Sequence, residues 1–341
     1  MDSILLVRDL LNATEGANGE PVHHKLGPHI THVPTESISR AAPYSALILC
    51  IMFVVIFAVR HWLLEAFLLE KYYGTIYTSM DETNRRGFLN HHIAVATRLL
   101  IFITAAYPFI DVAFVSASLH SPYAGSKHIT MGDVLLVISL GLIAMYVFEL
   151  FYRTKISPIS AGHHIGVIMI GSFAIAISMD LEHQPDATIE FVLCLVWGAF
   201  DIISEFLPHC AIILYRVYPT RHNFLRKVFY IGMVSTFAST VLETILTMYL
   251  FGSLWDRWSI GFKVATPMLH VLFASCQLWG TWIFYKMMKK QERLMNEQSG
   301  KPGDIERALM REKSGETHSI SKKSADVVTR EISSNSQSPS S

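Results

Sequence analysis

The fold of this chain is decided by residues 131–179, which read MGDVLLVISLGLIAMYVFELFYRTKISPISAGHHIGVIMIGSFAIAISM. Two apolar stretches, 131–152 and 159–179, flank a short linker that carries Arg153 and Lys155. Each stretch is long enough to cross the hydrocarbon core of a bilayer, which takes about 20 helical residues. Because a segment in lipid must satisfy its own backbone hydrogen bonds, these stretches predict two membrane-spanning helices.

The same composition extends over most of the 341-residue chain. Apolar residues make up 51% of it and charged residues only 16%, whereas soluble domains carry about 25% charged residues. The mean hydropathy is +0.35. We therefore expect an all-α, polytopic membrane protein with seven transmembrane helices. The spans are expected at 44–64, 90–117, 131–152, 159–179, 189–214, 228–252 and 262–286.

The loops between these spans alternate in charge, which predicts their orientation. Lys and Arg follow the first, third, fifth and seventh spans, whereas Asp180, Glu182 and Asp186 make the loop after the fourth span acidic. Under the positive-inside rule, the N-terminus is lumenal and the C-terminus is cytosolic. The formal net charge is +0, which by itself says nothing about nucleic acid. We expect membrane lipids as partners and no nucleic acid. The basic residues are Arg85, Arg86, Arg153, Lys155, Arg216, Arg221, Arg226, Lys227, Lys286, Lys289, Lys290 and Arg293.

Composition also divides the chain into regions. Residues 1–43 are a polar lumenal or extracellular tail that carries a glycosylation sequon at Asn12. Residues 44–84 hold the first transmembrane helix and a cytosolic loop, and residues 85–290 hold the other six spans. Residues 291–341 are rich in Ser, Lys and Glu, and we expect a disordered cytosolic tail. All four cysteines fall inside apolar spans, which predicts buried thiols rather than extracellular disulfides.

Ionisable side chains inside the spans are the candidates for function, because they are costly in lipid and normally face the bundle interior. Asp201 and Glu205 share one helical face with His209 through their four-residue spacing. The preceding span carries His163 and His164 at a similar depth. We expect these imidazoles and carboxylates to meet around an apolar chamber that opens toward the cytosol.

Further polar residues lie toward the same side of the membrane. His92 and Arg98 come early in the second span, and Glu149 comes near the end of the third. Two of them also have purely structural explanations, since Arg98 could pair with a carboxylate of the fifth span and Glu149 with Arg153. We assign catalysis to His163, His164, Asp201 and Glu205, and substrate binding to His92, Arg98, Glu149, His209 and Gln277.

A histidine beside a carboxylate can act as a general base or as a nucleophile. The carboxylate then orients the ring and stabilises the imidazolium. The same residue types could bind zinc or iron. However, the adjacent histidines point about 100° apart on a helix, and the H-x-x-H-H boxes of membrane di-iron enzymes are missing. We therefore expect no metal and no cofactor.

Two segments resemble a known family. Tyr146–Arg153 (YVFELFYR), the basic linker and Ser160–Val167 (SAGHHIGV) resemble the double-histidine signature of TLC-domain proteins, which include translocation-associated membrane proteins and ceramide synthases. The stretch Gly198–Glu205 (GAFDIISE) is similar to the D-x-x-D-x-x-x-E motif of ceramide synthases, with Gly198 in place of the first acid. The resemblance covers roughly residues 85–290, including the last span and its basic flank.

The resemblance implies a TLC-type helical barrel that encloses a lipid cavity, in the endoplasmic reticulum. It implies an acyltransferase of the sphingosine N-acyltransferase type, with acyl-CoA as co-substrate and membrane lipids as partners. His163 and His164 would be the base or acyl-accepting residues, and Asp201 and Glu205 would orient them. The resemblance is also compatible with a homodimer.

Three other functions stay open. The first is a non-catalytic TLC protein that binds lipid or maintains membrane-lipid composition. The second is a seven-helix receptor, although the chain lacks a D-R-Y-like motif, an N-P-x-x-Y-like motif and paired extracellular cysteines. The third is a zinc-dependent membrane amidase or hydrolase.

Overall fold

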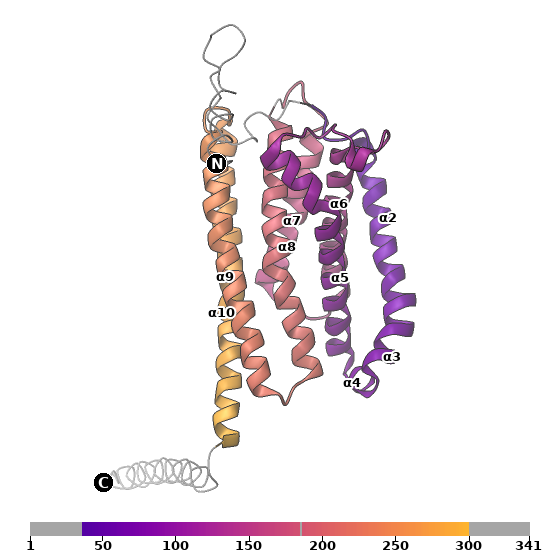
Figure 1. Cartoon of the computed structure of the whole chain (residues 1–341), viewed down its shortest axis with the longest axis vertical. Coiled ribbons are helices and arrows are strands. Elements are labelled where there is room, and N and C mark those ends of the chain that lie inside the picture. Colours follow the sequence, from indigo (N-terminus) through magenta and orange to yellow (C-terminus); the bar gives the residue numbers. More distant parts are fainter. Residues whose placement is uncertain (1–35, 185, 300–341) are drawn as a thin grey trace, which may run out of the picture.

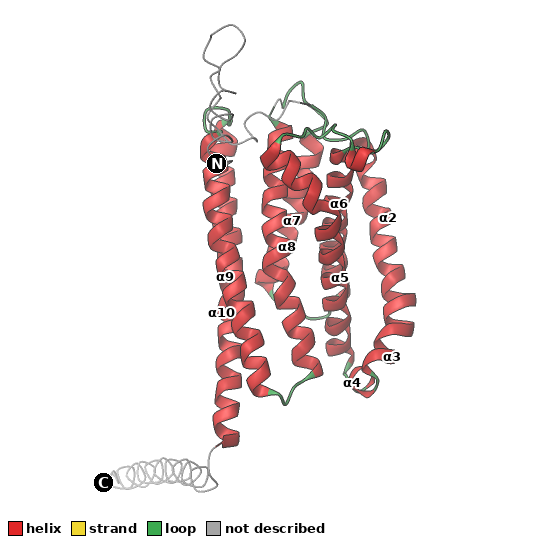
Figure 2. Cartoon of the chain, viewed as in Figure 1, coloured by secondary structure: helices red, strands yellow, loops and turns green. Residues whose placement is uncertain are grey.

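The structure is a computed structural model that describes residues 36–184 and 186–299. Within these ranges the chain forms helices and no strand (Figure 2), so the all-α prediction is confirmed there. The predicted sequon at Asn12 and residues 300–341 of the last tail lie outside the described residues.

Among the described residues, six helices are long and apolar enough to cross a membrane, which fits a multi-pass membrane protein. The first runs over Ala42–Tyr73 and contains α2 (Ser45–Ala58), a π-helical stretch (Val59–Leu68) and α3 (Leu69–Tyr73). The second, Glu82–Val115, contains α5 (Glu82–Ile110) and a short π-helical end (Asp111–Val115). The others are α6 (Met131–Tyr152), α7 (Pro158–Ile177), α8 (Ala187–Val217) and α9 (His222–Ser253).

The seventh expected span, 262–286, lies within α10 (Ile260–Ser299), which is not among the six. Its central part carries Thr266, His270 and Gln277, which make it less apolar than the other long helices. The structure therefore supports six of the seven predicted spans by length and composition.

Local capping explains where several helices begin. The Asp81 side chain accepts a hydrogen bond from the Asn84 N–H at the start of α5, at 3.0 Å. Thr130 and Asp133 form a reciprocal capping box at the start of α6. Ser157 caps α7, and Pro158 follows it as the first helical residue. These interactions satisfy N–H groups that have no partner within the helix.

The long helices lie side by side along one direction (Figure 1). Four of them close a ring, in which α5 packs on α6, α6 on α7, α7 on α8 and α8 on α5. The first span packs outside this ring against α6, while α9 packs against α8 and α10 against α9. The ring therefore brings the polar residues of α5, α6, α7 and α8 into one interior.

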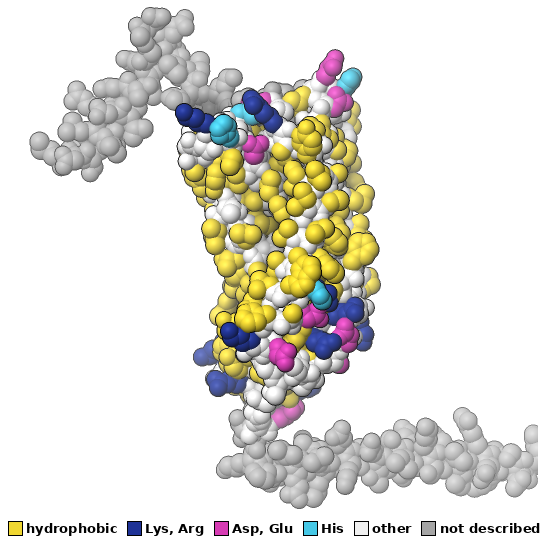
Figure 3. All heavy atoms as spheres, turned by 90° about the vertical axis from the view of Figure 1, so that its right-hand side faces the viewer, with side chains coloured by type: hydrophobic (Ala, Val, Ile, Leu, Met, Phe, Trp, Pro, Cys, Tyr) yellow, Lys and Arg dark blue, Asp and Glu magenta, His cyan; other side chains and the backbone are white. Residues whose placement is uncertain are grey.

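The surface separates apolar from charged side chains. Figure 3 shows hydrophobic side chains over the middle of one face and most Lys and Arg near one end. This end holds α4 (Thr75–Thr78) and the connection between α8 and α9 (Figure 1). We call it the basic end. An apolar middle with basic side chains gathered at one end is the pattern of a membrane-spanning bundle.

Candidate functional site

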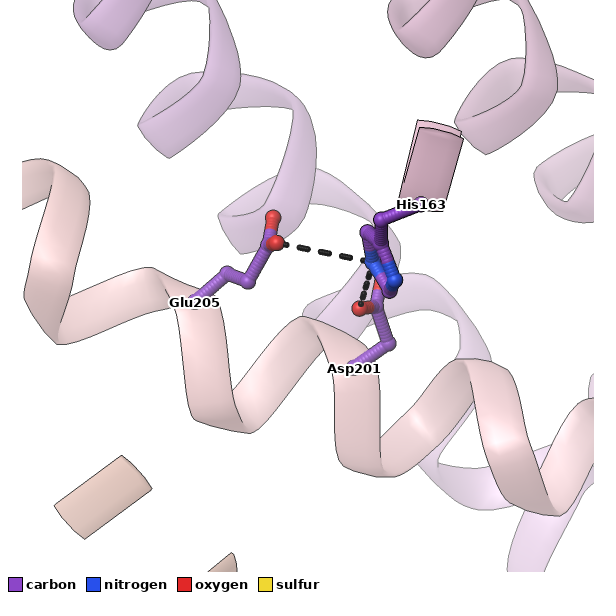
Figure 4. Close-up of side chains that lie close together, drawn as sticks. All are labelled: His163, Asp201 and Glu205. Carbon is purple, nitrogen blue, oxygen red and sulfur yellow. Dashed lines mark hydrogen bonds and ion pairs between the residues drawn. The ribbon is translucent and has the colours of Figure 1, made fainter. Parts of the chain in front are cut away.

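The site begins at the contact between α7 and α8. The Nε2 atom of His163 lies 3.0 Å from Oδ1 of Asp201 and 3.6 Å from Oε1 of Glu205 (Figure 4). Asp201 and Glu205 face α7 together because they are one helical turn apart. His163 and Asp201 are buried, and the Glu205 side chain is 25% exposed. The structure thus brings one of the two predicted histidines together with both predicted carboxylates.

His164 is buried but lies elsewhere. Its ring packs against the ring of Tyr146, with 4.5 Å between the centroids. No hydrogen bond or ion pair within the described residues joins it to Asp201 or Glu205. The separation follows from the helix, because adjacent residues point about 100° apart.

Arg98 of α5 and Tyr146 of α6 complete the cluster. The fully buried Arg98 guanidinium forms an ion pair with Glu205 and donates to the Tyr146 hydroxyl at 3.0 Å. The Tyr146 hydroxyl in turn donates to Oδ2 of Asp201. All four helices of the ring are therefore joined by polar contacts around His163.

Sequence reasoning did not assign Tyr146 to the site, although it opens the family-like segment. The available signal was a hydroxyl group inside an apolar span, one turn before Glu149 on the same helix. Such a group in lipid needs a hydrogen-bond partner, and only the packing of α6 against α8 identifies it as Asp201.

Three further predicted residues, His209, His92 and Glu149, lie toward the basic end. His209 Nε2 is 3.6 Å from Oε2 of Glu205, and its Nδ1 is 2.7 Å from Nδ1 of His91. His92 contacts the Tyr73 hydroxyl at 2.9 Å, outside this cluster. Glu149 pairs with Arg153 at 2.5 Å. This ion pair agrees with the purely structural explanation of Glu149. The ion pair between Arg98 and Glu205 likewise agrees with the purely structural explanation of Arg98.

A cavity of about 260 Å³ adjoins the cluster and is lined by α5, α6, α7 and α8, together with residues of α9 and α10. Three of the nine predicted site residues, His163, Asp201 and Gln277, line it. The cavity extends from His163 and Asp201 away from the basic end. Most of its wall is apolar, including Ile101, Ala105, Phe109, Leu135, Ile138, Leu142, Ile143, Val167, Ile170, Phe191, Leu195 and Ile202.

The cluster offers two kinds of chemistry. His163, Asp201 and Glu205 present ligand atoms within 4.8 Å of one another, which is compatible with a metal ion. However, Arg98 already pairs with Glu205, and a cation would have to compete with this guanidinium. Proton transfer needs no such competition, because Asp201 holds His163 by Nε2, and the buried Nδ1 atom has no partner among the described residues.

Comparisons with known proteins add no assignment. No protein-family model matches the chain. No curated protein matches it, and no solved structure does.

Proposed function

We propose that this chain is a TLC-type membrane lipid-metabolism protein that transfers an acyl group from acyl-CoA to the amino group of a sphingoid base. One observation carries the proposal: an apolar cavity inside the helical bundle is lined by a His163–Asp201 pair. Such a cavity suits an alkyl chain, and such a pair suits acyl transfer.

The proposed reaction uses the residues as they lie. His163 takes a proton from the attacking amine, the nitrogen bonds to the thioester carbonyl carbon, and the carbon–sulfur bond breaks. The proton on His163 then passes to the departing thiolate, which leaves as the thiol of coenzyme A. Asp201 orients the imidazole and stabilises its charged form. Tyr146 and Arg98 act as positioning residues, because they hold Asp201 and Glu205.

The proposed setting is the endoplasmic reticulum, with α10 as the seventh span. This arrangement has a lumenal N-terminus and places the basic end in the cytosol, where acyl-CoA is available. Treatment of the expressed protein with an endoglycosidase tests this orientation. The wild type is expected to shift in electrophoretic mobility and an Asn12→Gln variant is not. A cytosolic N-terminus in a protease-protection assay would contradict it.

Turnover by the purified protein tests the reaction. The protein in lipid nanodiscs, given palmitoyl-CoA and sphinganine, is expected to form the amide, measured by mass spectrometry. His163→Ala is expected to lower the rate by roughly 10²-fold or more, as for loss of a general base. His183→Ala is the matched control, because this histidine lies on an exposed loop and, among the described residues, pairs with Asp180 outside the cavity lining. Equal rates in wild type and His163→Ala would rule out the His163 mechanism.

A second function, lipid binding without catalysis, is favoured by one specific feature. Gly198 lines the cavity where ceramide synthases carry the first acid of their motif. On this alternative, lipid co-purifies with the protein and no amide forms. Mass spectrometry of the co-purified lipid, with a search for an acyl adduct on His163 or His164, separates the two functions.

A further inference from the structure

A second polar group lines the cavity from outside the ring of four helices. Glu243 of α9 is 3% exposed and Gln277 of α10 is 8% exposed, and both side chains line the cavity. The Gln277 amide donates to Oε2 of Glu243 at 2.8 Å. The Thr240 hydroxyl lies 2.7 Å from the Gln277 side-chain oxygen and 2.8 Å from the Thr236 carbonyl oxygen, so it joins the amide to the backbone of α9.

Within the described residues, Glu243 lacks the cationic partner that Glu205 and Glu149 have nearer the basic end. Glu205 pairs with Arg98 and Glu149 pairs with Arg153. No Lys, Arg or His nitrogen of residues 36–184 and 186–299 lies within 4 Å of Glu243. A neutral amide supplies a hydrogen bond but no countercharge. A carboxylate buried in a membrane-type helix normally has a cationic partner or a functional role.

The same cavity wall contains an unused donor. Trp197 of α8 lines the cavity, and its indole N–H is buried without an acceptor among the described residues. Buried polar groups in proteins are normally satisfied. Glu243, which has no countercharge within the described residues, and Trp197, whose buried indole N–H has no acceptor there, thus both line one apolar space. This combination points to a ligand with a polar group of its own.

We propose that Glu243, held by Gln277, anchors the ammonium group of a single-chain lipid amine whose alkyl chain lies in the cavity. An ammonium group supplies the missing charge and donates up to three hydrogen bonds. An alkanol supplies one donor and no charge, and a fatty acid carboxylate would be repelled. The inference rests on the proposed function only in placing a lipid in this cavity, and it does not require His163 to be catalytic.

Native mass spectrometry of the full chain in nanodiscs, titrated with dodecylamine or dodecanol, tests the site. The wild type is expected to bind the amine more tightly. Glu243→Gln is expected to weaken amine binding roughly tenfold or more and to leave dodecanol binding unchanged. The matched control is Glu190→Gln, because Glu190 is also a buried glutamate of a membrane-type helix but does not line the cavity. It should bind both ligands as the wild type does.

Equal affinity of the wild type for amine and alkanol would overturn the inference, as would unchanged amine binding by Glu243→Gln. Retained dodecanol binding shows that the variant still folds. If Glu243→Gln also lost dodecanol binding, the variant Gln277→Leu would test the site instead. It removes the amide that holds the Glu243 carboxylate in place, so it should also reduce the preference for the amine over the alkanol. If the protein binds the amine through Glu243 but forms no amide, the proposed reaction is wrong and the amine site stands. If acyl transfer is unaffected by Glu243→Gln, the amine site is wrong and the proposed reaction stands.

Discussion

Tyr146 of α6 donates a hydrogen bond to Oδ2 of Asp201, the carboxylate whose Oδ1 atom lies 3.0 Å from His163. The same hydroxyl accepts a hydrogen bond from Arg98 of α5. The Tyr146 hydroxyl therefore connects Arg98, which pairs with Glu205, to Asp201, which contacts His163. This relationship makes the cluster a unit whose members can be tested separately.

Replacement of Tyr146 by Phe is expected to destabilise the protein by about 1–3 kcal/mol, because Asp201 and Arg98 each lose a buried partner. Thermal unfolding in detergent, followed by circular dichroism, measures the change. Tyr215→Phe is the control, since this ring packs on Phe229 and its hydroxyl lies outside the cluster. A Tyr146→Phe protein as stable as the control would show that the hydroxyl is dispensable.

Replacement of Arg98 by Leu is expected to cost about 3–5 kcal/mol of stability, because it leaves the Glu205 carboxylate in the bundle without its cation. The double variant Arg98→Leu/Glu205→Leu should recover part of this loss, since no unpaired charge remains. A double-mutant cycle from unfolding midpoints gives the coupling energy.

The matched control for this cycle is the exposed pair Arg293–Glu297, where both side chains are more than half exposed. Its loss should change the unfolding midpoint little, because solvent screens exposed pairs. Equal effects of the buried and exposed pairs would mean that Arg98 and Glu205 do not depend on each other.

His163 and His164 are expected to behave differently when each is replaced by Ala. His163 contacts Asp201 and lines the cavity, whereas His164 packs on Tyr146 and does not line it. Loss of His163 should remove acyl transfer and also lower the unfolding temperature, because Asp201 loses a buried partner. Loss of His164 should lower the unfolding temperature and leave acyl transfer in place. The rate of acyl transfer and the melting temperature are measured for both variants. Acyl transfer that is lost in His164→Ala but kept in His163→Ala would identify His164 as the reacting residue.

Gly198 offers a way to change the size of the cavity. A Cβ at this position would meet only Leu142 Cδ2, at 3.9 Å, so a larger side chain can enter the cavity without a backbone clash. Gly198→Leu is expected to shift the co-purified lipids to shorter chains, measured by mass spectrometry. Gly280→Leu on α10 is the control, because its added Cβ has no neighbour within 4 Å. An unchanged lipid profile in Gly198→Leu would place the lipid elsewhere.

Metal analysis of the purified protein is expected to find no stoichiometric zinc or iron, since the Arg98 guanidinium pairs with one of the three candidate ligands. Inductively coupled plasma mass spectrometry measures the content, and treatment with a chelator should leave the melting temperature unchanged. One ion per chain, lost in a His163→Ala variant, would instead establish a metal centre and support a hydrolase.

Local features of the chain were sufficient to place most helices. The expected span 131–152 coincides with α6, and 159–179 differs from α7 (Pro158–Ile177) by at most two residues. The first expected span, 44–64, ended too early, because the helix continues to Tyr73. The continuation carries Arg60 and Glu65, whose mutual ion pair at 2.8 Å lets charged residues remain in the helix.

Sequence by itself determined which residues are apolar enough to span a membrane, where charged loops interrupt them, and that Asp201 and Glu205 share a helical face. These properties depend on composition and on the 3.6-residue period, which are local. Only the tertiary structure decided that His163 and not His164 meets the carboxylates, that Tyr146 and Arg98 hold them, and that Glu243 reaches the same cavity. These choices depend on how each helix is rotated and shifted against its neighbours, which is set by side-chain packing between segments far apart in the chain.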